Sequence, residues 1–470
     1  MTRTSPDATH GAWNALGGDP AHLPRISSVS RDGALAARLP VIVLARACVG
    51  VCALAAAELT ALRTGGDVPR VLVDDGAVAT AFTSERHLSV DGRRPVNFAP
   101  LSRFWRTADG WVRTHANYPH HRAALLAALD VPGTGTGSEN AVAVAVAARL
   151  AELPATKAED AVYAAGGLAV ALRTPEEWAA HPQGAASAGQ PLVHREPLGP
   201  APARDLAPLT GSPARPADGL RVLDLTRVIA GPVATRTLAL LGADVLRVDP
   251  PGLPELADQH TDTGFGKRSV TLGLGDRADR RVFEDLLSTA DVVVTGYRPG
   301  ALDRFGLSPR ELAARRPGLV VAQLSAWGAQ GPWARRRGFD SLVQVATGIA
   351  AVEGGPDEPG ALPAQALDHG TGYLLAAAVL RTVTEQAAQG GTGYVRLSLA
   401  RTAAWLMSLG AAQSGGRSAE APEGPAPWLA ERDSPLGRLR YALPPVSFTD
   451  GPVNWSRPPG IWGADRPRWR

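Results

Sequence analysis

Cysteine and lysine are nearly absent from this chain of 470 residues. Two cysteines, Cys48 and Cys52, are too few for a disulfide framework, and we expect no metal site on them. Four positions apart on an apolar stretch, they would share one helix face as free, buried thiols. Lys157 and Lys267 leave 46 of the 48 basic residues as arginine. Arginine suits phosphate binding, but a chain-wide bias is also what a GC-rich genome produces, so it indicates no ligand by itself.

Long hydrophobic runs and a large net charge are absent as well. The formal charge of +3 gives no indication of a nucleic-acid partner. The first 19 residues are polar and lack the apolar core of a signal peptide. The longest apolar stretch, 41–59, contains Arg46 and Glu58, which predicts a buried helix and not a membrane span. We therefore expect a cytoplasmic protein without a membrane partner.

The segment from residue 219 onward has the pattern of an α/β fold. Short runs of β-branched and aliphatic residues predict strands, and helical stretches lie between them. This alternation predicts a Rossmann-like, partly parallel sheet with covering helices. The expected strands are 221–225, 244–248, 292–295, 319–324 and 395–399.

The first 190 residues are less regular. The Asp109-Gly110 pair supplies the turn of a hairpin, and Thr174 followed by Pro175 predicts a helix start. Segments rich in proline, glycine and small residues predict loops at 132–138 and 414–427, and an interdomain linker without helix or strand at 191–218. The expected elements are a helix at 40–63, a strand at 70–73, a hairpin at 104–114 and helices at 141–153 and 158–172.

Two distant segments echo each other. Residues 54–73 and 374–399 both predict an alanine-rich helix, a glycine turn and a strand. Such a pattern arises by chance in an alanine-rich chain or by duplication, and the residues leave both open. Aligning the two segments places Ala47 opposite Asp368.

Six short motifs follow one another between residues 219 and 399. They are GLRVLDLT with AGP (219–232), LGADVLRVD (241–249), GKRSV (266–270), ADV with RPGAL (290–302), GFD (338–340) and ALDHGTG (366–372). In this order they resemble the core of the family III (CaiB/BaiF-type) CoA-transferases. That resemblance implies a Rossmann-like CoA-binding domain and a second, smaller α+β domain.

The remaining residues resemble the same family in an unusual order. Residues 103–112 and 174–178 resemble its smaller domain, which normally follows the core, and 444–448 resembles its closing strand. We interpret the chain as two truncated tandem copies or one rearranged copy. The predicted divisions are 1–98 (a partial first copy without the catalytic aspartate), 99–190 (the small-domain-like region), 191–218 (the linker), 219–413 (the CoA-binding core) and 414–470 (a linker and closing segment).

The resemblance makes Asp368 the catalytic nucleophile. It implies transfer of CoA from an acyl-CoA thioester to a free carboxylic acid through an aspartyl mixed anhydride and an aspartyl-CoA thioester. Acyl-CoA is then a substrate, and no tightly bound cofactor or metal is expected. From the residues alone, Asp368 precedes a helix whose positive end should keep it ionised, and Gly370 and Gly372 should let a thioester approach. A plain helix-capping role for Asp368 is the alternative.

The resemblance also implies a CoA site. It places Val228, Ile229 and Ala230 in the first loop against the CoA chain, with Leu272 and Arg304 also lining the site, Arg304 as a cation for its phosphates. Three positions depart from the family pattern, because Pro250, Gly275 and Gly296 stand where an arginine, a lysine and an asparagine are usual. Candidates for a mobile glycine-rich loop are Gly354-Gly355 and Gly415-Gly416.

Other functions and assemblies stay open at this stage. A non-catalytic protein that binds CoA esters or a partner would explain the lost contacts. A related racemase would need a histidine where this chain has Phe339, since phenylalanine cannot exchange a proton. His115, His120 and His121 lack an acidic or cysteine partner with ligand spacing, so a metal site is disfavoured. Family members form interlocked homodimers, although the order of segments here leaves a monomer open.

Overall fold

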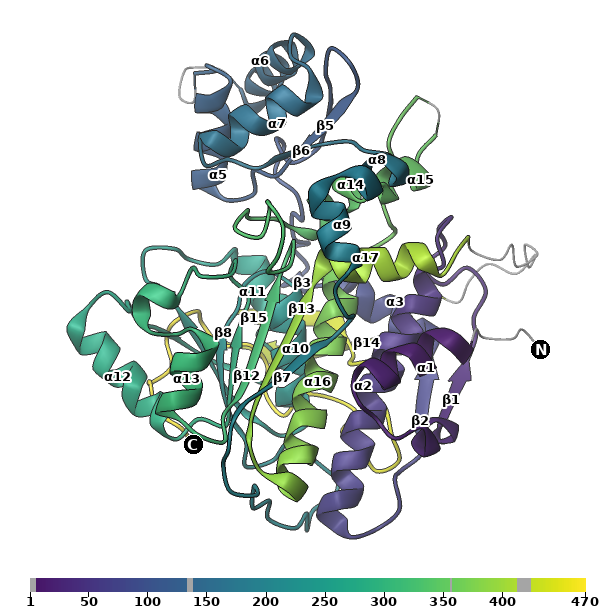
Figure 1. Cartoon of the computed structure of the whole chain (residues 1–470), viewed down its shortest axis with the longest axis vertical. Helices are drawn as coiled ribbons and strands as arrows, with labels where there is room; N and C mark the ends of the chain where they lie inside the picture. Colours follow the sequence, from purple (N-terminus) through teal and green to yellow (C-terminus); the bar gives the residue numbers. More distant parts are fainter. Residues whose placement is uncertain (1–5, 133–137, 356, 412–423) are drawn as a thin grey trace.

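The structure, a computed structural model, describes residues 6–132, 138–355, 357–411 and 424–470 (Figure 1). A seven-stranded sheet forms its centre. Six strands are parallel and the edge strand β7 (His194–Gly199) is antiparallel to its neighbour. The strand order is β10 (Arg268–Thr271), β9 (Asp244–Asp249), β8 (Arg221–Leu225), β11 (Val292–Thr295), β12 (Val320–Ser325), β13 (Thr392–Ser398) and β7. The predicted α/β class with a partly parallel sheet is confirmed.

The strand order contains a switch point. From β8 the chain builds outward through β9 to β10, and then returns to place β11 on the other side of β8. In sheets of this kind, neighbouring loops leave the sheet in opposite directions at the switch point, and the crevice between them binds ligands. The topology therefore predicts a site beyond the carboxyl ends of β8 and β11.

Helices cover both faces of the sheet (Figure 1). On one face α12 (Arg277–Ser288) and α13 (Pro309–Arg315) enclose an apolar core with Leu223 and Leu246. On the other face α10 (Ala230–Leu240) and α16 (Ala366–Gln389) belong to the larger core. The shorter helices of this region are α11 (Ala257–Thr263), η2 (Asp303–Phe305), α14 (Asp340–Ala346), α15 (Ile349–Glu353) and α17 (Leu399–Ser408).

Residues 99–190 include a small lobe whose separate core contains Leu101, Trp105, Val112 and Leu125, whereas Trp178 belongs to the larger core. Its strands β4 (Phe104–Arg106), β5 (Trp111–Thr114) and β6 (Ala169–Ala171) make an antiparallel sheet. Its helices are α5 (Pro119–Ala128), α6 (Glu139–Ala151), α7 (Ala155–Ala164), α8 (Pro175–Ala180) and α9 (Pro182–Ala188). The hairpin at 104–114 and the Thr174 cap, which forms a capping box with Glu177, are as predicted.

The N-terminal lobe, residues 6–98, packs against the core through α2 (Val41–Thr64). Its other elements are α1 (Pro6–Ala15), η1 (Pro20–Arg25), β1 (Ile26–Val29), β2 (Val71–Asp74), α3 (Asp75–Phe82), α4 (Ser84–His87) and β3 (Ser89–Val90). Helices α2 and α16 lie side by side, each has 24 residues, and each ends at a glycine before a strand (Figure 1). The two echoing sequences are thus paired helices in space, and their origin by duplication stays a prediction.

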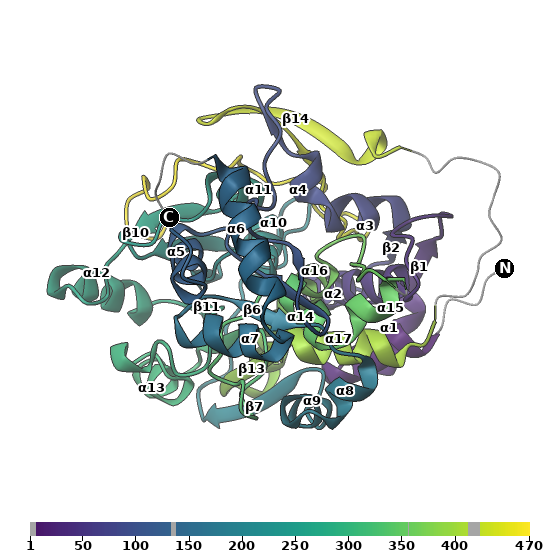
Figure 2. The ribbon, with the colours of Figure 1, turned by 90° about the horizontal axis from the view of Figure 1, so that it is seen from above.

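The C-terminal residues close two exposed edges. The hairpin of β14 (Leu429–Ser434) and β15 (Gly437–Ala442) pairs with β3 and runs along one side of the molecule (Figure 2). Farther on, the backbone of Asp465 donates to Ser269 in β10, and the Asp465 carboxylate accepts from the backbone of Ser269. Covering an edge strand in this way leaves fewer free backbone groups for pairing with another chain.

Some sequence predictions of the fold are wrong. The predicted linker 191–218 contributes β7, whose mostly polar sequence gave no strand signal. Residues 165–172 continue no helix, because the chain turns at Gly166-Gly167 and enters β6. The expected closing strand at 444–448 makes a single bridge between Phe448 and Val71. Most of the loop predicted at 132–138 and of that at 414–427, with Gly415-Gly416, lies outside the described residues.

Helix α2 is the one described helix long and apolar enough to cross a membrane. In its most apolar window, 83% of the residues are buried inside the protein. Core helices of soluble proteins pass the same test, and the polar neighbours of Arg46 fit that explanation, since its guanidinium pairs with Asp75 at 2.6 Å.

Cys48 and Cys52 lie on this helix, fully buried and free. Burial raises the pKa of both thiols, so the reactive thiolate is scarce. We expect neither to react with a disulfide reagent such as DTNB until the protein unfolds. A matched probe is the variant Ser288→Cys, which places a thiol on the exposed end of α12. Labelling of the native protein as fast as that variant would contradict the burial.

Candidate active site

A cavity of about 470 Å³ lies at the carboxyl ends of the parallel strands. Residues at the ends of all six contribute to its wall, as the switch point predicts. The small lobe closes it from the other side through Tyr118, His120 and His121. The strand-end residues in the wall are Leu225, Val248, Leu272, Gly296, Leu324 and Leu399.

One carboxylate and five arginines line this cavity within the described part of the chain. The carboxylate is that of Asp368, in the first turn of α16. The arginines are Arg227, Arg298, Arg304, Arg336 and Arg337. The rest of the wall is mostly apolar or aromatic, so the cavity suits a molecule with an apolar part and an anionic part.

Asp368 is 6% exposed and its backbone N–H donates to the buried carboxylate of Asp340 at 2.9 Å. Burial, followed by the neighbouring charges of Asp340 and Glu85, raises the pKa of Asp368 well above that of an ordinary aspartate. Burial also raises the pKa of Asp340 to about 6, although the N–H of Asp368 and the amide of Gln344 act the other way. Ionisation of the Asp368 carboxyl group is therefore less favourable than that of an exposed carboxyl group, and its carboxylate is more basic.

This geometry corrects two expectations about the helix start. Asp340 accepts the N-terminal N–H groups of α16 at Asp368 and Leu367, so these donors do not stabilise the Asp368 anion. Gly370 and Gly372 do not face the cavity. A side chain at Gly370 would come within 3.0 Å of Leu44 on α2, and one at Gly372 within 2.6 Å of the Ala230 carbonyl. The two glycines permit close packing of helices and leave no path for a thioester.

The loop after β8 forms another part of the wall. Val228 has a φ of 69°, a left-handed conformation that β-branched residues rarely adopt. Its N–H donates to the Glu255 carboxylate at 2.9 Å, and the Arg227 guanidinium donates to the Leu253 carbonyl at 2.7 Å. These hydrogen bonds hold the loop against the cavity. They help to offset the strain of the Val228 backbone, which is about 1–3 kcal/mol for such a conformation.

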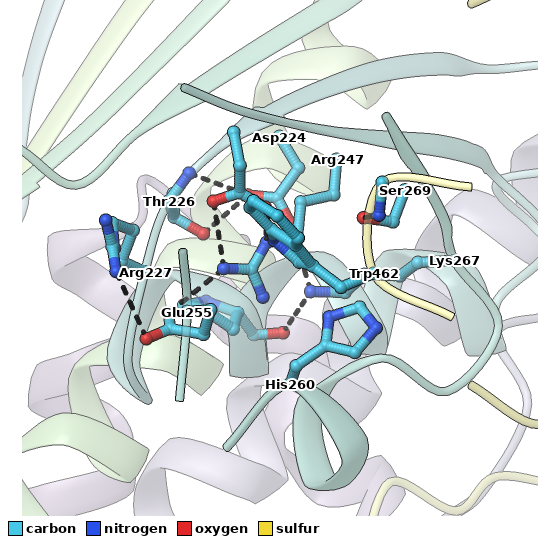
Figure 3. Close-up of polar contacts among 12 residues, drawn as sticks. Asp224, Thr226, Arg227, Arg247, Glu255, His260, Lys267, Ser269 and Trp462 are labelled. Atoms are coloured by element: carbon cyan, nitrogen blue, oxygen red, sulfur yellow. Dashed lines mark hydrogen bonds and ion pairs between the residues drawn. The ribbon is translucent and has the colours of Figure 1, made fainter. Parts of the chain in front are cut away.

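A buried ionic cluster lies beneath that loop (Figure 3). Lys267 donates to Asp224 at 2.9 Å, while Arg247 pairs with Asp249 at 2.7 Å and with Glu255 at 3.0 Å. Burial lowers the pKa of Lys267 to about 8, even with Asp224 beside it. Burial opposes the ionisation of Glu255, but Arg247 and Arg227 hold its pKa down to about 2. Lys267 is thus structural, as is Arg268, which pairs with Asp244.

The predicted CoA-binding residues lie around this cavity with one exception. Val228, Ala230, Leu272 and Arg304 all line it, whereas Ile229 is buried behind them and is absent from the described wall. Of the positions that depart from the family pattern, Pro250 and Gly296 are in the wall, and Gly275 is not among the wall residues described. A role of these residues in binding CoA stays a prediction.

Sequence reasoning missed Arg298 and Arg337 as cavity residues. Burial, followed by repulsion from Arg298, lowers the pKa of Arg337. The Arg337 guanidinium has the Gly166 carbonyl as acceptor at 3.3 Å, and no acidic partner is present for either residue among those described. An RPG motif and a run of three arginines at 335–337 are visible in the sequence, but nothing there places them together.

The histidines gather at the small-lobe side of the cavity without forming a metal site. His115 stacks on Phe339 with ring centroids 3.7 Å apart, and burial lowers the pKa of both His115 and His121 to about 3. No group of three or more potential ligands occurs among the described residues. The rings of Tyr118, His120, His121 and Phe339 form part of the cavity wall.

Comparison with known proteins finds a similarity to one family over part of the chain. Residues 217–428 match the family model for CoA-transferase family III. A probable fatty acyl-CoA transferase of Mycobacterium tuberculosis is 35% identical over 213 residues, 42% of this chain and 54% of that protein. An acetyl-coenzyme A transferase of Hypoxylon pulicicidum is 31% identical over 323 residues, 66% of this chain and 54% of that protein. An acetyl-CoA:oxalate CoA-transferase of Acetobacter aceti is 39% identical over 31% of this chain and 41% of that protein.

Solved structures are similar over a comparable part of the chain. The crystal structure of a hypothetical protein from Mycobacterium tuberculosis is 36% identical, with a TM-score of 0.40, and covers 42% of this chain and 58% of that one. A CaiB/BaiF family protein from Brucella suis is 27% identical, with a TM-score of 0.39, over 48% of this chain and 65% of that one. The chain spans about half the length of the relatives it matches. Through residues 217–428, slightly less than half of its length, this chain resembles CoA-transferase family III.

Proposed function

We propose that the protein transfers CoA from an acyl-CoA thioester to a free carboxylic acid, with Asp368 as the nucleophile. The observation that carries the proposal is the composition of the cavity. Among the described residues, one carboxylate and five arginines line it, at the carboxyl ends of the strands where this topology binds ligands. Its relatives named as acetyl-CoA and oxalate CoA-transferases support the same reaction class.

The proposed reaction needs no group beyond the carboxylate and the two substrates. An oxygen of Asp368 attacks the acyl carbonyl carbon, the C–S bond breaks, and a mixed anhydride and CoA thiolate form. The thiolate attacks the Asp368 carbonyl carbon, which releases the donor acid as a carboxylate and leaves an aspartyl-CoA thioester. The acceptor carboxylate then attacks that thioester and releases CoA thiolate. Attack of the thiolate on the acceptor's carbonyl gives the new acyl-CoA and restores Asp368.

The raised pKa of Asp368 fits a nucleophile that must be both basic and ionised. A more basic carboxylate is a stronger nucleophile, provided that the working pH lies above its pKa. The surrounding arginines place positive charge in the same cavity, and an acyl-CoA brings its phosphates to them.

The test is exchange of CoA into isotope-labelled free acids. The protein is incubated with a panel of acyl-CoA esters, short and long, and each labelled acid is followed into the CoA pool by mass spectrometry. Exchange with at least one pair supports the proposal. Binding of acyl-CoA without any exchange would favour a non-catalytic binding protein. Homodimer formation and a cytoplasmic location remain predictions, and light scattering decides the former.

Replacing Arg337 or Arg298 by glutamine is expected to raise the KM for acyl-CoA about tenfold, because each loses charge-assisted hydrogen bonds to a phosphate. The value of kcat should change less, since neither touches the reacting carbonyl in this scheme. A matched control is Arg310→Gln, which removes an arginine that is 81% exposed on α13 and paired with Glu196. An equal rise of KM in the control would contradict a specific role for the cavity arginines.

A further inference from the structure

A buried acid–imidazole pair lies directly behind the candidate nucleophile. His369 follows Asp368 on α16, is fully buried, and its Nε2 lies 3.7 Å from Oε2 of Glu85. Neither imidazole nitrogen, nor Oε2 of Glu85, has a hydrogen-bond partner among the described residues. A buried polar atom without a hydrogen bond raises the free energy of the folded protein. A small side-chain rotation would bring His369 Nε2 and Glu85 Oε2 within hydrogen-bonding distance.

The acid of this pair comes from outside the family match. Glu85 is on α4 of the N-terminal lobe, whereas the match begins at residue 217. Burial opposes its ionisation, but His369 and then Arg86 hold the pKa of Glu85 below its ordinary value. The carboxylate therefore stays charged, although it is 9% exposed. Its charge is in turn one of the causes that raise the pKa of Asp368.

The segment that carries Glu85 is held by contacts of two residues just before it in the chain. Ser84 donates to the Asp262 carboxylate at 2.8 Å, and Arg236 on α10 lies 3.2 Å from that same carboxylate. Two positions before Ser84, the Phe82 ring stacks on the His369 ring with centroids 5.3 Å apart. The N-terminal lobe thus holds the His369 ring by stacking on its face and by an acid near its edge.

Two roles are conceivable for such a pair, and burial decides between them. A general base must reach the reacting atoms or a water beside them. His369 is fully buried and is not in the described wall of the cavity, whereas Asp368, one residue earlier on the helix, is. Any effect of the Glu85–His369 pair on Asp368 is therefore indirect, through the position of α16 and through the charge of Glu85.

We propose that Glu85 of the N-terminal lobe is a positioning residue for the nucleophile, holding His369 and thereby fixing the first turn of α16 and the direction of the Asp368 carboxylate. The proposal rests on the proposed function for its kinetic consequences. The N-terminal lobe then contributes to the active site. Its residue Glu85, which lies outside the family match, is the partner of His369, and His369 follows the nucleophile Asp368 in the chain.

Besides the five arginines and the histidines of the cavity wall, few charged or titratable groups of the described residues lie around this site. Asp368 faces Asp340 from α14 and Glu85 from α4, with His369 on its own helix. Glu85 in turn faces Arg86 and His87 on its own helix. Helix α2 brings the thiol of Cys48 close to Gly370, where burial keeps it uncharged, and α17 brings only the hydroxyl of Thr402.

The test is the variant Glu85→Gln, which keeps the shape of the side chain and removes its charge. With one of its two neighbouring carboxylates gone, the pKa of Asp368 should fall. The acid limb of the kcat profile should then move to lower pH by on the order of one unit. We expect kcat at the optimum to fall about tenfold through the looser geometry, and KM for acyl-CoA to stay close to that of the parent.

The matched control is Glu58→Gln. Glu58 is another acid of the N-terminal lobe that pairs with α16, and its side chain is 13% exposed against 12% for Glu85, but its partner Arg381 lies more than three turns beyond Asp368. This control should lower thermal stability and leave the acid limb in place. A Glu85→Gln variant whose limb and kcat equal those of the parent, or a Glu58→Gln variant that moves the limb equally, overturns the proposal.

A second readout separates this proposal from the proposed function. The titration of Asp368 can be followed by ¹³C NMR of aspartate-labelled protein, with Asp368→Asn identifying its signal. A lower titration midpoint in Glu85→Gln supports the positioning role even in a protein that exchanges no CoA. An unchanged midpoint refutes it even in an active enzyme.

Discussion

The variant Asp368→Asn is expected to exchange CoA at least about 10³-fold more slowly than the parent. An amide oxygen cannot form the mixed anhydride, and no other carboxylate of the described residues lines the cavity. The fold should not suffer, because burial and two neighbouring acids disfavour the native charge at this position. Removing that charge should leave the melting temperature equal to or above that of the parent. Exchange rates and thermal melts of the same preparations check both parts.

A capping role for Asp368 predicts a different outcome, and the chain offers a control for it. Asp276 accepts the N–H groups of Ala278 and Asp279 at the start of α12 and is not among the described residues of the cavity wall. Asparagine caps helices about as well as aspartate, so Asp276→Asn should leave both activity and stability nearly unchanged. If Asp368→Asn likewise keeps its activity, the nucleophile lies elsewhere and the proposed reaction fails. Intact-mass analysis must accompany the assay, since deamidation would restore the aspartate.

The sheet was predictable because its strands carry their own signal. Val292–Thr295 and Val320–Ser325 are buried on both faces, and such strands have nearly continuous β-branched or aliphatic sequences. Strand β7 escaped prediction for the opposite reason. It is a partly exposed edge strand of sequence HREPLG, and its pairing with β13 is decided by the tertiary structure.

The presence of Asp368 in the cavity was predictable from the sequence, whereas its electrostatic surroundings were not. Asp368 stands within a motif that sequence resemblance identifies, whereas its electrostatic neighbours come from distant segments. Asp340 lies 28 positions before Asp368, and Glu85 lies on the N-terminal lobe. No local sequence pattern therefore predicts that these two acids raise the pKa of Asp368. The prediction for Gly370 and Gly372 was wrong for the same reason. The sequence favours a catalytic role for Gly370, and only the structure shows that α2 packs against it.

Replacing Lys267 by methionine is the change with the largest expected effect on stability. Lys267 and Asp224 are 2% and 0% exposed, and the ammonium also donates to the Pro232 carbonyl. Removing one partner of a buried ion pair leaves an uncompensated charge, which typically costs about 3–5 kcal/mol. The hydroxyls of Thr226 and Thr235 still donate to Asp224, but two neutral donors do not replace an ammonium. Denaturant unfolding of the parent and the variant measures the loss.

A second substitution separates the lost contact from the charge left behind. In the background of Lys267→Met, the change Asp224→Asn removes the buried charge and keeps an acceptor oxygen for one of the two threonine hydroxyls, while the other hydroxyl can accept from the new amide. We expect it to recover part of the lost free energy of unfolding, although alone it destabilises the parent by leaving Lys267 unpaired. The surface variant Arg315→Gln, which breaks an exposed pair with Glu284, is the control and should unfold like the parent. If Lys267→Met unfolds no more easily than that control, the cluster beneath the β8 loop does not hold the cavity wall in the way described.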